Sequence, residues 1–310
     1  MTGILLSLLL SWGIVQTSSV FLRSAPDYES ALDSQSRMGT VVEILEQKGY
    51  WVKVRTPEPY EGWVNELCLA PVSEAEKDAW LAAPRYLCTV EATHVLEAPD
   101  AHAPRICDLL MGNMLRQGEG RSGAYVAVVL PSGRKGWVRH DEVVDFSRWA
   151  GACRKAVAPG SDPSVTAAAI LATARRFLGV PYLWGGMSAK HFDCSGLTGF
   201  CYFMQGLLLP RDASQQVKCG VEVPVEQMQA GDLVFFGEKK VSHVALCIGP
   251  GRIIHSSQLV RINSLDPSAP DAYTRNILHV RRILGHLGDG TPVSCIADSP
   301  CYFSPTLVQN

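Results

Sequence analysis

An internal repeat in the first half is the feature of this 310-residue chain that most limits its fold. Ala25-Pro26-Asp27 recurs as Ala98-Pro99-Asp100, 73 positions later, and Gly62-Trp63-Val64 recurs as Gly136-Trp137-Val138, 74 positions later. A repeat at this spacing indicates two copies of one domain. Short β-branched and aromatic runs, separated by turn residues, lie between these markers. Such runs are typical of small all-β domains, so we expect two related β-domains in the first half.

The composition favours an enzyme of small substrates over a nucleic-acid-binding protein. The chain has 28 basic and 30 acidic residues, a formal charge of −2 and no basic tract, so it offers no electrostatic footprint for nucleic acid. It has no CxxC pair and no HExxH motif, so we expect no metal and no cofactor. The ten cysteines are scattered singly, and the disulfide that the sequence favours is Cys295 with Cys301. We expect a monomer.

The N-terminal segment has two interpretations. Residues 4–10 form an apolar run of the length of a signal-peptide core, too short to span a bilayer. The run lacks a basic flank, and the segment from Gly13 to Arg23 is typical of a first strand. A short or truncated signal predicts a periplasmic or secreted protein, whereas an uncleaved buried strand is compatible with the cytoplasm. No membrane span is expected in either case.

One cysteine stands where a nucleophile belongs. Cys194 precedes apolar residues at the spacing of one helix face, namely Leu197, Phe200, Cys201 and Met204. Cys194 is therefore expected at a helix start, where unpaired N–H groups and the helix dipole favour thiolate. Such sites lower a cysteine pKa from about 8.5 to roughly 3.5–7.5. Cys201 and Cys247 fall on apolar faces, and we expect them in the core.

Three strand-like runs follow, and two of them carry a histidine. Residues 231–236 read as a turn into a buried strand, residues 242–249 as a second strand, and residues 252–257 as a third. His243 opens the second run and is the candidate general base. His255 lies in the third, where its ring could hydrogen-bond the far nitrogen of His243 and hold its tautomer.

Together these residues resemble the NlpC/P60 cysteine peptidases over about residues 165–285. Phe-Asp-Cys-Ser-Gly-Leu, Gly-Asp-Leu-Val-Phe-Phe and Ser-His-Val-Ala occur in the order of that family, followed by His255. The resemblance implies an α+β, papain-like fold, with the cysteine-bearing helix packed on an antiparallel sheet that carries the histidines. It also implies hydrolysis of amides in peptidoglycan peptides.

The resemblance implies roles for four residues near Cys194. Asp193 and Ser195 contact the substrate, Tyr182 lies near the oxyanion and Trp184 lies in the wall of the cleft. A helix-cap role for Asp193 is the structural alternative. Core packing is the alternative for the two aromatic residues.

The first half resembles bacterial SH3-like domains, clearly in the first copy and loosely in the second. With the peptidase domain, this architecture is similar to the γ-D-glutamyl-L-diamino acid endopeptidases, the dipeptidyl-peptidase VI group. There the first barrel reads the free amino terminus of L-Ala-γ-D-Glu, and the resemblance assigns Tyr60 to that contact and Asp212 to the ammonium. A buried ammonium without a carboxylate would leave an unpaired charge at a cost of several kcal/mol, so an acidic residue is expected there. A helix cap is the alternative for Asp212.

The expected organisation is therefore a papain-like NlpC/P60 domain preceded by two small SH3-like β-barrels. The predicted segments are a short or truncated signal 1–12, SH3-like domains 13–72 and 85–146, linkers 73–84 and 147–164, the peptidase domain 165–290 and a tail 291–310. The predicted substrates are murein peptides with a free L-Ala. A wall-binding protein with an inactive peptidase domain, or an amidase of the N-acetylmuramoyl-L-alanine type, remains the alternative.

Overall fold

The computed structural model describes residues 11–288 and 292–304 and divides into two compact units. One unit runs to Trp149 and includes the C-terminal segment from Ala297, and the other is Ala150–Ile296. Most of the candidate signal segment lies outside the described residues. None of the described helices is long and apolar enough to cross a membrane.

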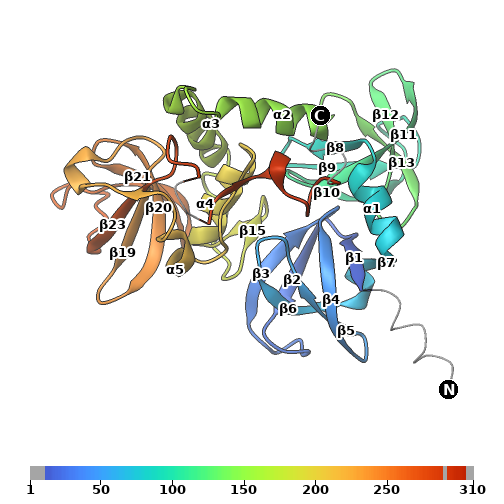
Figure 1. The fold of residues 1–310 in the computed structure, drawn as a ribbon, viewed down its shortest axis with the longest axis horizontal. Helices are drawn as coiled ribbons and strands as arrows, with labels where there is room; N and C mark the ends of the chain where they lie inside the picture. The colour runs from blue at the N-terminus through green and yellow to red at the C-terminus, as the bar shows by residue number, and fades with distance from the viewer. Residues whose placement is uncertain (1–10, 289–291, 305–310) are drawn as a thin grey trace. The chain divides into compact units, whose positions relative to one another are not determined.

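Two seven-stranded antiparallel sheets make up the first unit, and their strands follow one another in the same order (Figure 1). The order β3-β2-β6-β5-β4-β1-β7 in the first sheet becomes β10-β9-β13-β12-β11-β8-β14 in the second. The first sheet contains β1 (Trp12–Val15), β2 (Ser19–Arg23), β3 (Leu32–Arg37), β4 (Val41–Lys48), β5 (Trp51–Arg55), β6 (Glu61–Asn65) and β7 (Leu69–Val72), with a 3-10 turn at Glu66–Cys68. The second contains β8 (Arg85–Cys88), β9 (Ala92–Leu96), β10 (Arg105–Leu110), β11 (Met114–Ser122), β12 (Tyr125–Val129), β13 (Lys135–Arg139) and β14 (Val143–Asp145). The internal repeat is therefore a repeat of topology.

The repeated glycines explain part of this equivalence. Gly62 lies on β6, where an added Cβ would come within 2.8 Å of the Leu22 side chain on β2. Gly136 lies at the matching place on β13, where an added Cβ would come within 2.5 Å of Val95 on β9. Both positions need glycine because the facing strand leaves no room for a side chain.

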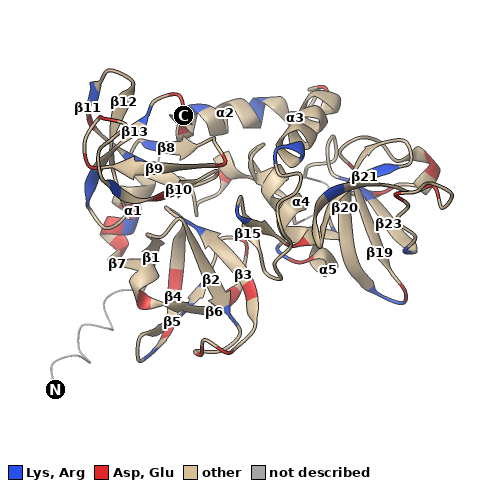
Figure 2. Ribbon diagram, turned by 180° about the vertical axis from the view of Figure 1, so that it is seen from behind, with Lys and Arg blue, Asp and Glu red and all other residues tan. Residues whose placement is uncertain are grey.

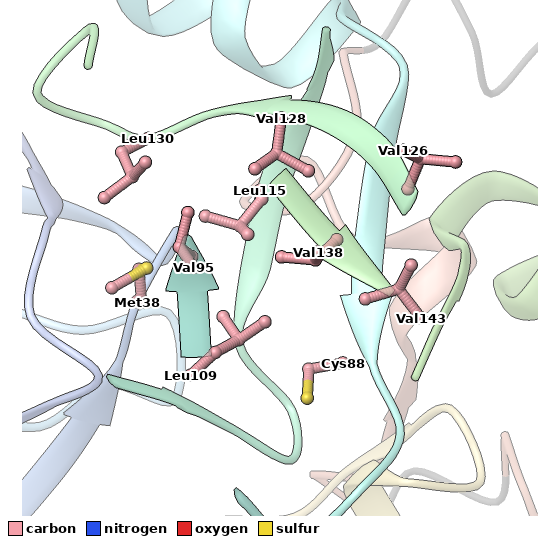
Figure 3. Close-up of a cluster of buried hydrophobic side chains, with 10 residues drawn as sticks. All are labelled: Met38, Cys88, Val95, Leu109, Leu115, Val126, Val128, Leu130, Val138 and Val143. Atoms are coloured by element: carbon pink, nitrogen blue, oxygen red, sulfur yellow. The ribbon is translucent and has the colours of Figure 1, made fainter. Parts of the chain in front are cut away.

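Each sheet has its own apolar cluster. The second cluster contains Val95, Leu109, Val128 and Val138 and also the side chain of Met38, which follows β3 of the first sheet (Figure 3). The Met114 N–H donates to the Met38 carbonyl at 2.9 Å. The two sheets therefore share core contacts within the first unit.

Helices occupy much of the two segments expected to be linkers. Helix α1 (Glu74–Ala82) begins with a capping box, in which the Ser73 N–H donates to the Glu76 carboxylate at 2.8 Å. The indole N–H of Trp80 donates to the Gly39 carbonyl at 3.1 Å, and this tryptophan packs beside Ile14. Helix α2 spans Phe146–Ala156. The segment 73–84 is thus a packed part of the first unit, not an open linker.

The C-terminal segment is also packed. Tyr302 is fully buried, its hydroxyl donates to Glu58 at 3.0 Å and its carbonyl accepts from Arg85. Burial lowers the pKa of Arg85 to about 10. The predicted disulfide is wrong, because no disulfide bond joins Cys295 to Cys301.

The second unit is an antiparallel six-stranded sheet with helices packed on it. The strand order is β18-β23-β19-β20-β21-β22. The strands are β18 (Val221–Glu222), β19 (Leu233–Gly237), β20 (Val241–Gly249), β21 (Arg252–Ser257), β22 (Leu259–Ser264) and β23 (Ile277–Arg282), and the helices are α3 (Pro163–Arg175), α4 (Cys194–Phe203) and α5 (Ala213–Gln216). Smaller elements are β15 (Met187–Ser188), β16 (His191–Phe192), β17 (Leu207–Leu208), β24 (Ser294–Cys295), and 3-10 turns at Val225–Gln227 and Ile296–Asp298. Helix α4 packs against β20 and β21, which confirms the predicted helix-on-sheet arrangement.

The acidic and basic residues are interspersed along the ribbon of the first sheet (Figure 2). On the first sheet, for example, Arg55 bonds both Glu43 and Glu61, at 2.6 and 2.7 Å. Among residues 11–288 and 292–304, no group of His, Cys, Asp and Glu side chains is arranged to hold a metal ion.

Candidate active site

Cys194 is the first residue of α4, as the sequence predicts. Asp193 is the N-cap and accepts a hydrogen bond from the Gly196 N–H at 2.6 Å, which satisfies one of the free amides of the first turn. Gly196 packs against the preceding turn so closely that an added Cβ would lie 1.9 Å from the Gly186 carbonyl oxygen. Gly185 in that turn has φ +80, a conformation that favours glycine. The glycines of the motif therefore fix the nucleophile helix against the turn.

A buried ion pair holds the N-cap. Arg211 donates to the two carboxylate oxygens of Asp193 at 3.2 and 2.5 Å and to the Ser195 hydroxyl at 3.0 Å. The Gly185 N–H also donates to Asp193, at 2.9 Å. The helix-cap alternative for Asp193 is thus what the structure shows, while substrate contact by Asp193 and Ser195 stays a prediction. The sequence reading missed Arg211, although it singled out the Asp212 beside it.

The two candidate histidines are joined by the predicted hydrogen bond. His243 Nε2 lies 2.7 Å from His255 Nδ1, and His255 Nε2 lies 2.9 Å from Asn263 Oδ1. Neighbouring strands β20, β21 and β22 supply the three residues, all of them buried. Asn263 was missed because its part depends on the pairing of β21 with β22, which no local pattern reveals.

Helix α4 and strand β20 meet at Cys194. The backbone of Val244, the residue after His243, hydrogen-bonds Cys194 and favours its thiolate, as does the backbone of Ser195. Burial and the charge of Asp193 outweigh these bonds and raise the pKa of Cys194. The predicted lowering of this pKa is therefore wrong, because helix position alone does not decide it.

Both histidines are neutral at physiological pH. Burial is the largest cause that lowers the pKa of His243 to about 3, followed by the nearby His255. Burial likewise lowers the pKa of His255 to about 4. These shifts favour a neutral thiol and neutral imidazoles in the free site.

Two aromatic residues face the site besides the histidines. Burial, followed by the proximity of Cys194, raises the pKa of Tyr182 to about 12, so its phenol remains a hydrogen-bond donor. The Tyr273 ring centroid lies 4.5 Å from that of His255 and 5.5 Å from that of His243. Nothing in the local sequence around Tyr273 indicates that this residue lies beside the histidines.

Trp184 is 66% exposed, so the alternative of core packing is excluded for this residue.

The remaining predicted residues lie in different places. Asp212 is the half-buried residue before α5, and its N–H donates to Gln215 Oε1 at 3.0 Å. Tyr60 precedes β6 in the other unit and packs on the core of the first sheet. Its carbonyl accepts from the Thr56 N–H at 3.0 Å, which closes the loop before β6.

Comparisons with known proteins match both parts of the chain. The NlpC/P60 family model matches residues 179–282, and the bacterial SH3 domain model matches residues 18–70. A gamma-D-glutamyl-L-lysine dipeptidyl-peptidase of Bacillus cereus is 30% identical over 266 residues, covering 82% of this chain and 75% of that protein. Its Bacillus subtilis namesake is 27% identical over 268 residues, covering 82% of each.

A solved structure agrees over nearly the whole chain. The crystal structure of an NlpC/P60 family protein from Bacillus cereus has a TM-score of 0.72 and 25% identity, covering 88% of this chain and 100% of that chain. The family model and the solved structure therefore both match the part of the chain that contains α4 with Cys194 and the strands with His243 and His255. The chain belongs to the NlpC/P60 family of cysteine peptidases.

Proposed function

We propose that this protein hydrolyses the amide between γ-D-glutamate and an L-diamino acid, lysine or diaminopimelate, in murein peptides that begin with a free L-Ala. The observation that carries the proposal is the hydrogen bond to Cys194, at the start of α4, from the backbone of Val244, which follows the buried His243 in β20. His243 in turn bonds His255. The relatives named for γ-D-glutamyl-L-lysine cleavage match over both the SH3 and the peptidase parts of the chain.

Cys194 is the nucleophile in this mechanism and His243 is its base. Because the free thiol and imidazole are neutral, His243 takes the proton as sulfur bonds to the γ-carbonyl carbon. The Cys194 N–H and the Tyr182 hydroxyl stabilise the oxyanion, and one such donor contributes about 3–4 kcal/mol. His243 then protonates the departing amine. Finally it accepts a proton from the water that hydrolyses the thioester.

Amino-terminal selectivity is assigned to two residues. The free α-ammonium of L-Ala needs a carboxylate partner, since an unpaired buried charge is strongly unfavourable. Asp212 is assigned as that carboxylate. Tyr60 keeps the role that the family resemblance implies, a contact with the free amino terminus of the substrate. The shared strand order of the two sheets supports two SH3-like domains, of which the first carries Tyr60.

Arg275 is assigned to a substrate carboxylate. Its guanidinium donates to the Ser242 hydroxyl at 2.7 Å, next to His243, and it is exposed. A peptide linked through the γ-carboxyl of D-Glu keeps a free α-carboxylate close to the cleaved bond. An exposed guanidinium beside the base suits that group.

The proposed site of action is outside the cytoplasmic membrane, in the periplasm or the surroundings of the cell, with the enzyme acting as a monomer. The similarity to NlpC/P60 peptidases with a bacterial SH3 domain supports this location. Cell fractionation with an antibody tests it, and recovery of the enzyme only in the cytosol would overturn it.

Product analysis by mass spectrometry tests the function. The enzyme is incubated with L-Ala-γ-D-Glu-L-Lys, its diaminopimelate counterpart and N-acetylated copies of both. Release of L-Ala-γ-D-Glu from the free peptides alone is expected. Cleavage of the acetylated copies as well would overturn amino-terminal selectivity. If none of the peptides is cleaved, the peptidase proposal is overturned.

Two variants control that experiment. Cys194→Ala removes the nucleophile and is expected to abolish product formation with an unchanged circular dichroism spectrum. Tyr60→Ala is expected to raise KM for the free peptide or to admit the acetylated one. Unchanged behaviour of the Tyr60 variant on both peptides would remove its assigned role.

A further inference from the structure

Three hydrogen bonds run in series from His243 to a backbone carbonyl. His243 bonds His255 at 2.7 Å, His255 bonds Asn263 Oδ1 at 2.9 Å, and Asn263 Nδ2 bonds the Asp271 carbonyl at 2.6 Å. His243, His255 and Asn263 are 5%, 0% and 8% exposed. Water therefore has little access to replace a missing partner in this series.

The Asp271 carbonyl fixes the orientation of the Asn263 amide. A carbonyl oxygen only accepts hydrogen bonds, so the group that faces it must be the NH₂ of the amide. The opposite orientation would bring two acceptor oxygens to 2.6 Å, which is repulsive. Oδ1 therefore faces His255, and it too can only accept.

This orientation passes along the series as a choice of tautomer. His255 must carry its proton on Nε2 to donate to Asn263, and a neutral imidazole has only one N–H. His255 Nδ1 is then an acceptor, so His243 must donate from its own Nε2. The remaining nitrogen of His243, Nδ1, keeps a free lone pair, which is the form that a base requires.

We propose that Asn263 is a positioning residue that sets His243 in the tautomer able to accept the thiol proton, with the Asp271 carbonyl as the fixed end of the series. The inference rests on the proposed role of His243 as the base. With Asn263 reversed, every proton in the series would reverse and His243 Nδ1 would carry an N–H. Such a ring cannot accept the proton of Cys194.

Nitrogen NMR of the ¹⁵N-histidine-labelled full chain tests the tautomers directly. At neutral pH both His243 and His255 are expected to show a protonated Nε2 and an unprotonated Nδ1. A spectrum with the proton on Nδ1 of His243 would overturn the proposal from the wild-type protein alone. This measurement needs no substrate.

The rate of Cys194 alkylation by iodoacetamide, followed on its tryptic peptide, tests the consequence. Asn263→Leu has no acceptor for His255, so His255 is expected to lose its single tautomer. Alkylation of Cys194 is then expected to slow by about 10-fold or more. For comparison, a wrong histidine tautomer in one serine protease lowers kcat about 10⁴-fold. Asn263→Gln keeps both the acceptor oxygen and the NH₂ group and is expected to retain more of the wild-type rate than Asn263→Leu. Asn276→Leu, the same change at an exposed position, is the matched control.

The outcomes separate this inference from the proposed function. Equal rates for the folded Asn263→Leu and wild-type proteins would overturn it, as would equal losses in the Leu and Gln variants. Alkylation does not depend on the murein peptide, so a failure of the peptide assay would leave these readouts intact. If Asn263→Leu does not fold, the wild-type spectrum and the Gln variant still decide.

Discussion

The buried ion pair behind the nucleophile predicts that Arg211→Met destabilises the peptidase unit by about 3–5 kcal/mol, the usual effect of breaking one side of a buried pair. The Arg211 and Asp193 side chains are 3% and 8% exposed. Without the guanidinium, Asp193 keeps the N–H groups of Gly185 and Gly196 but loses its countercharge. Urea unfolding followed by circular dichroism gives the free energy of unfolding.

Two further variants make this prediction refutable. Arg252→Met removes one side of a pair with Asp271 whose side chains are 48% and 43% exposed, so it is expected to change the free energy by only about 0–1 kcal/mol. Adding Asp193→Asn to the Arg211 variant is expected to recover part of the loss. A loss below about 1 kcal/mol in Arg211→Met would refute the reasoning, since it would mean that water solvates the carboxylate.

Three other changes follow from the site. Gly196→Ala places a Cβ 1.9 Å from the Gly186 carbonyl oxygen and should lower both the melting temperature and kcat, measured by calorimetry and peptide assay. Arg275→Gln should raise KM with little change in kcat. The pKa values of His243 and His255 are lowered to about 3 and 4 in the folded protein, against 6.5 in the unfolded chain. Below pH 6.5 the unfolded chain therefore binds protons that the folded protein does not. The free energy of unfolding is at its full value above pH 6.5 and decreases as the pH falls towards 4. Each histidine contributes about 1.4 kcal/mol per pH unit, so His255→Gln should flatten urea-derived stability between pH 6 and 5.

Local sequence patterns were sufficient for the elements of the peptidase unit. The runs 231–236, 242–249 and 252–257 correspond to β19, β20 and β21, and the apolar spacing after Cys194 corresponds to α4. These elements follow from side chains of near neighbours, which periodicity reports directly. Helix α3 begins at Pro163, where Asp162 is the N-cap and accepts a hydrogen bond from the Ser164 N–H.

Helix α1 shows a signal that the sequence reading did not use. Ser73 and Glu76 have the spacing of a capping box, and both of its hydrogen bonds are present. Trp80 then buries its ring in the first unit. Residues 73–84 were predicted to be a linker because they lie between the two repeats, but their capping residues indicate a helix.

The parts that sequence could not supply depend on contacts between distant segments. Arg211 reaches Asp193 only once the segment before α5 has folded beside α4, and Asn263 reaches His255 only through the register of β21 and β22. The prediction of a lowered pKa for Cys194 is wrong for the same reason. A helix start is visible in sequence, but the burial that outweighs it comes from the packed sheet.

These buried contacts share one design, in which each reactive group is oriented by a partner that is itself fixed. Arg211 holds Asp193, which caps the helix of Cys194, and the Asp271 carbonyl holds Asn263, which orients the two histidines. Burial keeps thiol and imidazole neutral in the free enzyme. In the proposed mechanism, the negative charge passes from sulfur to the oxygen of the bound carbonyl as His243 takes the thiol proton. Reactivity is in this way coupled to occupancy of the site, because the environment that penalises an idle thiolate also strengthens the hydrogen bonds to an oxyanion.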